Sequence, residues 1–158
     1  SLDAETVIRS LQRAHAAGAS RADLLRLTAR ALRAAGPPYT SVYLYMLDGD
    51  DLVLEAHDGR DTEHTRIPVG QGVCGTAVAE KRDLNIPDVR EVGNYLACSL
   101  QTRSELVVLI REGETIFAQI DIDSHTVNAF DAAATAKVER VAAWLARAYA
   151  AARSTRAP

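Results

Sequence analysis

The sequence predicts an α+β fold in which helices gather on one face of an antiparallel sheet. The predicted order is helix, helix, hairpin, short helix, hairpin, helix, which lacks the regular alternation that a parallel sheet requires. The run LVVLI at residues 106–110 is apolar on both faces, so we expect a central strand that is covered on each side. A length of 158 residues suits one domain, and we expect a single domain over residues 1–158.

Residues 1–36 are predicted to form the N-terminal helices. Apolar residues recur there at helical spacing in two stretches: Val7, Ile8, Leu11 and Ala14, then Leu24, Leu25, Thr28, Ala31 and Leu32. Ser20 with Asp23 three residues later is a typical helix cap, and Gly36-Pro37-Pro38 ends the second helix.

Residues 40–124 are predicted to carry the sheet and the site. A first hairpin joins residues 40–47 to residues 52–54 through an acidic turn, and the polar stretch 55–65 is predicted to be a surface loop or a lid. Residues 70–75 are rich in glycine and lead into a short helix over residues 76–81.

The C-terminal part of the chain contains a second hairpin and a long helix. Residues 104–110 and 116–123 are strongly β-prone and are joined by the turn Glu112-Gly113-Glu114. The last helix is predicted over residues 129–153, with Val138, Val141, Leu145 and Tyr149 along one stripe.

Composition excludes several classes of partner. The net charge is −3 and the basic residues are scattered, so we expect no nucleic-acid partner. No stretch approaches 18 uninterrupted apolar residues and no signal peptide is visible, so we expect a cytoplasmic protein without a membrane partner. Thiols stay reduced in that compartment, and the two cysteines are therefore expected to be a free pair or a catalytic couple.

Three carboxylates are predicted to converge at one end of the second hairpin. Alternation along residues 116–123 places Gln119, Asp121 and Asp123 on the same face, and Glu105 lies on the neighbouring strand at the same end. Crowded carboxylates raise one another's pKa, which would make one of them a proton donor near neutrality. The alternative is that these acids lie at a solvent-exposed strand end.

Cys74 and Cys98 are 24 residues apart, which excludes a CxxC redox motif and a zinc knuckle. No metal site is predicted, because the other available ligands are only scattered histidines. A buried cysteine is often merely a small apolar residue. The polar or glycine-rich surroundings of both cysteines favour a reactive role instead.

Five segments in order resemble the motifs of the free methionine-R-sulfoxide reductases, which are GAF domains. These are RIPVGQGVCGTA at residues 66–77, IPDV at 86–89, LAC at 96–98, the pair Ser104-Glu105, and IDIDS at 120–124. The intervals between the segments resemble those of the family as well. The resemblance implies a GAF-like sheet with the N- and C-terminal helices on one face and a ligand pocket on the other.

The resemblance also implies an activity. Cys98 would attack the sulfur of free methionine sulfoxide, and Cys74 would resolve the resulting sulfenic acid as a disulfide, which a thioredoxin-type reductant would reopen. No metal or organic cofactor is implied. Glu105, Asp121 and Asp123 would hold the substrate ammonium and protonate the leaving oxygen, and Tyr45 would pack against the substrate methyl group. By analogy, the first and last helices would form a homodimer.

Three positions depart from the family pattern. His64 stands where many members have a third cysteine, Ser41 where a tryptophan is usual, and Ser99 where an aspartate is usual. Tyr43 lies on the same strand face as Tyr45 and is expected to fill part of the gap at Ser41, whereas His64 is expected to be a solvated loop histidine. These departures keep open the alternative of a noncatalytic GAF sensor of a small ligand or of redox state. A separate alternative is a dimerising module of a larger signalling protein.

Overall fold

The computed structural model describes residues 1–93 and 100–156, with side chains described through residue 152. Within these residues, antiparallel pairing joins six strands into one sheet of order β3-β2-β1-β6-β5-β4. The strands are β1 (Ser41–Asp48), β2 (Asp51–Asp58), β3 (Arg66–Pro68), β4 (Leu84–Ile86), β5 (Ser104–Glu112) and β6 (Thr115–Ser124). The helices are α1 (Ala4–Ala16), α2 (Arg21–Ala34), α3 (Gly72–Glu80) and α4 (Ala132–Arg156), with a 3-10 turn at η1 (Val89–Glu91).

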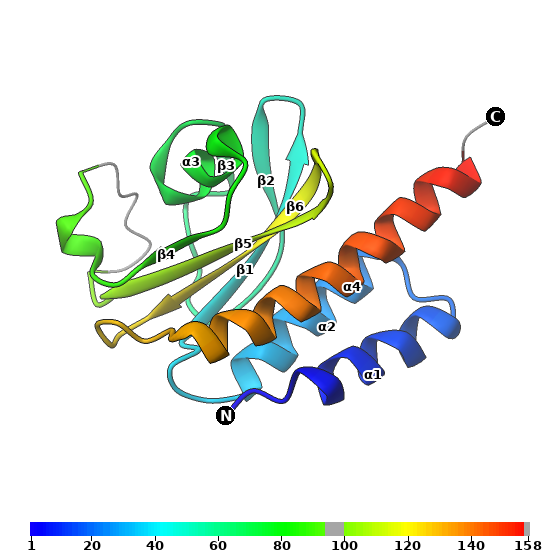
Figure 1. Ribbon diagram of the computed structural model, residues 1–158, viewed down its shortest axis with the longest axis horizontal. Coiled ribbons are helices and arrows are strands. Elements are labelled where there is room, and N and C mark those ends of the chain that lie inside the picture. The colour runs from blue at the N-terminus through cyan, green and yellow to red at the C-terminus, as the bar shows by residue number, and fades with distance from the viewer. Residues whose placement is uncertain (94–99, 157–158) are drawn as a thin grey trace.

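The long helices cover one face of the sheet, as Figure 1 shows. There α2 packs on β1 and β2 while α4 packs on β5 and β6, and α1 contacts both of these helices. Helix α3 lies on the opposite face. The predicted α+β class, with an antiparallel sheet and its terminal helices on one face, is confirmed.

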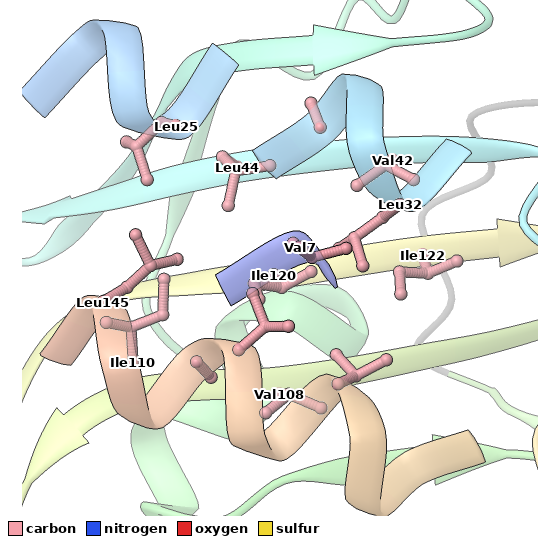
Figure 2. Close-up of a cluster of buried hydrophobic side chains, with 14 of the residues drawn as sticks. Val7, Leu25, Leu32, Val42, Leu44, Val108, Ile110, Ile120, Ile122 and Leu145 are labelled. Carbon is pink, nitrogen blue, oxygen red and sulfur yellow. The ribbon is translucent and has the colours of Figure 1, made fainter. Parts of the chain in front are cut away.

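The main core lies between the sheet and the long helices (Figure 2). It includes alternate residues from the three central strands, packed against apolar residues of the helices: Val42, Leu44, Val108, Ile110, Ile120 and Ile122, with Val7, Leu25, Leu32 and Leu145. Side chains alternate across a strand, so the residues between them face away from the helices. This alternation determines which residues are available to the opposite face.

The predicted cap of α2 is confirmed as a reciprocal pair. The Asp23 backbone N–H donates to Ser20 Oγ at 3.1 Å, and the Ser20 backbone N–H donates to Asp23 Oδ2 at 3.2 Å. Each bond satisfies an N–H group that the helix itself cannot pair.

Removing this cap should destabilise the fold by a small, measurable amount. We expect Ser20→Ala to lower the free energy of unfolding by about 0.5–2 kcal/mol, as for other helix caps. Urea denaturation followed by circular dichroism measures the change. Ser10→Ala, within α1, is the matched control and should not be destabilising, because alanine has the higher helix propensity. Equal effects of the two substitutions would contradict a capping role for Ser20.

The predicted loop over residues 55–65 is wrong in its first part, because β2 continues to Asp58. Residues 56–58 pair with Leu44, Tyr43 and Val42 of β1, and Ala56 is buried. These residues are polar overall, yet backbone pairing with a central strand and one buried alanine keep them extended.

Other boundaries also shift. The short helix begins at Gly72, so Cys74 lies in its first turn rather than in a loop, and the long helix begins at Ala132 after Asp131 accepts from the Ala134 N–H at 2.8 Å. The strands β3 and β4 were not predicted, because three residues are too few for a periodic pattern. Among the described residues, no helix combines the length and apolarity needed to cross a membrane.

Candidate functional site

The face of the sheet opposite the long helices carries polar and aromatic side chains. Strand pairing places Ser41 beside Asp123, and Asp123 beside Glu105. The next row along the strands sets Tyr43 beside Asp121, and the row after it sets Tyr45 beside Gln119. Three neighbouring strands therefore present these groups to one region.

The three predicted acids lie together and are buried. Glu105, Asp121 and Asp123 are only 4%, 1% and 2% exposed. The alternative of a solvent-exposed strand end is therefore wrong. Residues of α3 and His64 of the segment before β3 lie beside Glu105 and Asp121, which the strand pattern alone does not reveal.

Cys74 lies over the acids from the first turn of α3. It is buried at 6% exposure, and its Sγ is 3.9 Å from Glu105 Oε2. The Gln119 side-chain amide donates to the Cys74 carbonyl at 3.1 Å and thereby ties the helix to the sheet. A Cβ at Gly75 would lie 2.6 Å from the Pro68 carbonyl, so this glycine lets the helix approach β3.

The surroundings of Cys74 keep it as a thiol. Burial raises the pKa of Cys74 well above its ordinary value, and the charges of Asp121 and Glu105 raise this pKa further. A helix N-terminus favours a thiolate. Here desolvation and the neighbouring carboxylates outweigh that effect.

The surroundings of Asp121 shift the pKa of its carboxyl group. Burial raises the pKa of Asp121 above its ordinary value, and hydrogen bonds with Glu105 and Cys74 offset only part of that rise. Its Oδ1 is buried and has no hydrogen-bond partner among the described residues. This carboxyl therefore retains its proton to a higher pH than an ordinary aspartate and can act as a proton donor.

A small cavity lies at the centre of these groups. Its volume is about 10 Å³, and its described lining is Tyr45, His64, Ile67, Gly72, Val73, Cys74, Glu105 and Asp121. That space holds about one water molecule or ion, since a water needs roughly 10–15 Å³ by the same measure. An amino acid therefore needs the covering elements to move.

Larger surface hollows lie away from this site, and the two of greatest volume illustrate them. One of about 780 Å³ lies beside the end of α2, and one of about 570 Å³ lies beside Tyr149. Neither has a cysteine among its described lining residues. The small cavity, which combines a thiol with buried acids, is the better candidate for chemistry despite its size.

We call residues 59–65, which connect β2 to β3, the strap. Both site tyrosines hold it through hydroxyl groups: Tyr43 donates to the Arg60 carbonyl at 2.7 Å, and Tyr45 donates to the His64 carbonyl at 2.8 Å. His64 is half-buried and lines the cavity, so the prediction of a solvated loop histidine is wrong. The strap is the element that must move to enlarge the cavity on the tyrosine side.

Ser41 anchors the start of the strap. Its Oγ accepts from the Arg60 backbone N–H at 3.1 Å. A Cβ at Gly59 would lie 2.6 Å from Ser41 Oγ and 2.8 Å from Ser41 Cα. The small residue at position 41 and the glycine at position 59 are therefore matched, and a tryptophan at position 41 would collide with the strap.

A side chain at position 59 should displace the strap. Gly59 has φ +118°, and a Cβ there would overlap Ser41. We expect Gly59→Ala to lower the free energy of unfolding by about 1–3 kcal/mol through backbone strain, with the overlap adding to that loss. Chemical denaturation measures the change. The control is Gly49→Ala, which also has positive φ but meets nothing within 4 Å. A loss no greater than that of the control would contradict the close contact.

Not every predicted site residue can be placed. Cys98, the predicted nucleophile, lies with Ser99 outside the described residues. Cys74 is described and is a free cysteine. The sequence predicts no role for Gln119, although strand alternation places it on the acidic face. The role of the Tyr43 hydroxyl depends on the path of the strap and had no sequence signal.

The fold agrees with the relationships of the chain. The family model described as GAF domain matches residues 20–149. The chain therefore belongs to the GAF domain family. Within that family it groups with the free methionine-R-sulfoxide reductases, as the following relatives illustrate.

The free methionine-R-sulfoxide reductase of Escherichia coli is 40% identical over 86 residues, which cover 54% of this chain and 52% of that protein. The chain thus matches about half the length of this curated relative. The structure of the type II free methionine-R-sulfoxide reductase of Thermoplasma acidophilum superposes with a TM-score of 0.77 at 33% identity, covering 80% of this chain and 90% of that one. The Neisseria meningitidis enzyme, solved in complex with its substrate, gives a TM-score of 0.85 at 29% identity and covers 96% and 91%.

GAF domains outside this group share the fold. A putative GAF sensor protein of Burkholderia vietnamiensis superposes with a TM-score of 0.82 at 21% identity, covering 90% of each chain. At that identity the likeness concerns the fold alone. The fold by itself therefore does not separate an enzyme from a sensor.

Proposed function

We propose that this protein reduces free L-methionine-R-sulfoxide to methionine, with Cys98 as nucleophile and Cys74 as resolving thiol. The observation that carries the proposal is a buried thiol whose Sγ lies 3.9 Å from Glu105 Oε2 and within 4.8 Å of a carboxyl oxygen of Asp121, a second buried acid whose pKa is raised by burial. The family relationship supports the same chemistry. Neither a metal nor an organic cofactor takes part in the proposed reaction.

The proposed reaction begins at Cys98. Its thiolate attacks the sulfoxide sulfur, the oxygen passes to Cys98 as a sulfenic acid, and the substrate leaves as methionine with its sulfur reduced by two electrons. Asp121 supplies a proton to the oxygen as negative charge develops on it. Glu105 and Asp123 complement the positive charge of the substrate ammonium.

The state of Cys74 supports its assignment as the resolving residue. A thiol that burial and carboxylates keep protonated is a poor first nucleophile, because the thiolate is the reactive form. In the second step Cys74 attacks the sulfenic acid of Cys98, a disulfide forms, and the thiol proton leaves with the hydroxyl group as water. A thioredoxin-type dithiol then supplies two electrons and restores both thiols.

Substrate access depends on the strap. The cavity of about 10 Å³ is far below the roughly 300–1,000 Å³ of typical small-molecule sites, so binding requires an opening. Opening requires that the hydrogen bonds from the Tyr43 and Tyr45 hydroxyl groups to the strap break. Tyr45 then lies against the substrate from the same position.

The test is methionine formation from the separated epimers with a thioredoxin system. We expect turnover with the R epimer and none with the S epimer. Mass spectrometry after one equivalent of sulfoxide should show a Cys74–Cys98 disulfide and one released methionine. An absence of turnover with both epimers, or full turnover by Cys98→Ser, would overturn the proposal.

A noncatalytic GAF sensor is the second candidate, and the closed cavity with its matched Ser41 and Gly59 favours it. A sensor would retain methionine sulfoxide, or a similar small ligand, chemically unchanged, which the same mass measurement detects. For the reductase, we also propose a homodimer formed through α1 and α4, by analogy with the family. Sedimentation of the purified chain tests it.

A further inference from the structure

We propose that the reduced protein binds one Zn²⁺ ion in the small cavity, through the Cys74 thiolate and the carboxylates of Glu105 and Asp121. The proposal rests on the geometry of these side chains and holds for an enzyme or a sensor. Only its consequence for catalysis depends on the proposed function.

The spacing of the ligand atoms suits a tetrahedral ion. One atom from each of the three side chains lies within 4.8 Å of the others, and Cys74 Sγ is 3.9 Å from Glu105 Oε2. Zn–S bonds of about 2.3 Å and Zn–O bonds of about 2.0–2.2 Å place neighbouring ligand atoms roughly 3.5 Å apart. The Cys74 thiol and the Glu105 carboxylate need to close by several tenths of an ångström, and the Asp121 oxygen, within 4.8 Å of both, needs to close by up to about 1.3 Å.

A second observation points to a cation. Asp121 Oδ1 is buried without a hydrogen-bond partner among the described residues, and Asp121 lines the cavity. A buried carboxylate oxygen normally has a partner, because its desolvation is costly. The volume of the cavity, about 10 Å³, accommodates a single ion without the opening that an amino acid requires.

The donor set selects the metal. Thiolate is a soft ligand that favours zinc and similar ions, whereas magnesium and calcium require sites made of oxygen. Three protein ligands leave one tetrahedral position without a ligand from these side chains. Binding releases to solvent the Cys74 thiol proton and any proton that Asp121 holds, and it involves no change in oxidation state.

Zinc at this position would oppose the proposed reaction. A Cys74 sulfur bound to zinc cannot attack a sulfenic acid, and the ion occupies the acids that would hold the substrate ammonium. Given the proposed function, we expect Zn²⁺ to inhibit multiple turnover in competition with methionine sulfoxide. Oxidation of Cys74 to a disulfide removes a ligand and should release the ion.

The test is direct binding to the full reduced chain, without substrate. Calorimetric titration with Zn²⁺ should give one site per chain. Titration with Cd²⁺ as a spectroscopic probe should produce the ultraviolet thiolate-to-metal charge-transfer band. Cys74→Ser should abolish the band, Asp121→Asn should weaken binding at least tenfold, and Cys98→Ser should retain both the band and the affinity.

Two results would overturn the proposal. One is the absence of stoichiometric binding to the reduced chain, and the other is binding that survives Cys74→Ser but is lost in Cys98→Ser. Asp50→Asn, an exposed turn residue, is the control and should bind normally. Thermal unfolding of each variant verifies folding, and Asp121→Asn keeps the test valid if Cys74→Ser is unstable. Binding requires no turnover, so failure here is distinct from failure of the reductase assay.

Discussion

Asp121→Asn is expected to lower the rate of methionine formation by about 100- to 10,000-fold, the usual contribution of a general acid. The side chain keeps its size but cannot supply the proton that the sulfoxide oxygen requires. In the wild type, the rate should fall as pH rises through the raised pKa of Asp121, and that alkaline decline should disappear in the variant. Steady-state assays across pH measure both effects, and Asp50→Asn should keep the wild-type profile.

The same substitution should alter stability with a definite sign. Burial raises the pKa of Asp121 in the folded chain above its ordinary value of 3.8. At a pH between the ordinary pKa and the raised pKa, the folded chain therefore binds more protons than the unfolded chain. Wild-type stability therefore falls as pH rises through that window. The free energy of unfolding of Asp121→Asn, relative to wild type, should increase from about pH 4 toward neutrality. Parallel pH profiles would contradict a raised pKa at Asp121.

Cys74→Ser is expected to abolish multiple turnover with the thioredoxin system while leaving a single turnover. Cys98 can still take the oxygen and release one methionine per chain, but no thiol is left at position 74 to form the disulfide. Rapid-quench measurement should show a stoichiometric burst with no steady phase. Trapping with a sulfenic-acid reagent should label Cys98.

The matched variant is Cys98→Ser, which should release no methionine at all. The contrast separates the two roles, because loss of the nucleophile prevents the burst and loss of the resolving thiol prevents only its repetition. A burst in Cys98→Ser, or sustained thioredoxin-dependent turnover in Cys74→Ser, would reverse or remove the proposed assignment.

The predictions that held depend on local patterns. Alternation along β6 placed Asp121 and Asp123 on one face, and the hairpin turn at Gly113 set Glu105 beside them. The capping pair of Ser20 and Asp23 involves atoms three residues apart. Strand period, turn chemistry and helix capping act over short stretches of chain, so the sequence reveals them directly.

The predictions that failed concern segments whose structure depends on distant partners. The end of β2 is extended because it pairs with β1, although its composition resembles a loop. His64 lines the cavity because Tyr45, 19 residues away, holds its carbonyl. A polar composition does not distinguish a solvated loop from one that is tied down by such contacts.

The sequence by itself determined the α+β class, the antiparallel hairpins and the set of acids that share one face of the sheet, because each follows from residue spacing. Only the tertiary structure decided that the acids are buried, that Cys74 remains a thiol and that the cavity is small. Burial and pKa depend on which distant segments cover a side chain. Here those segments are α3 and the strap, whose positions arise from contacts between residues far apart in the chain.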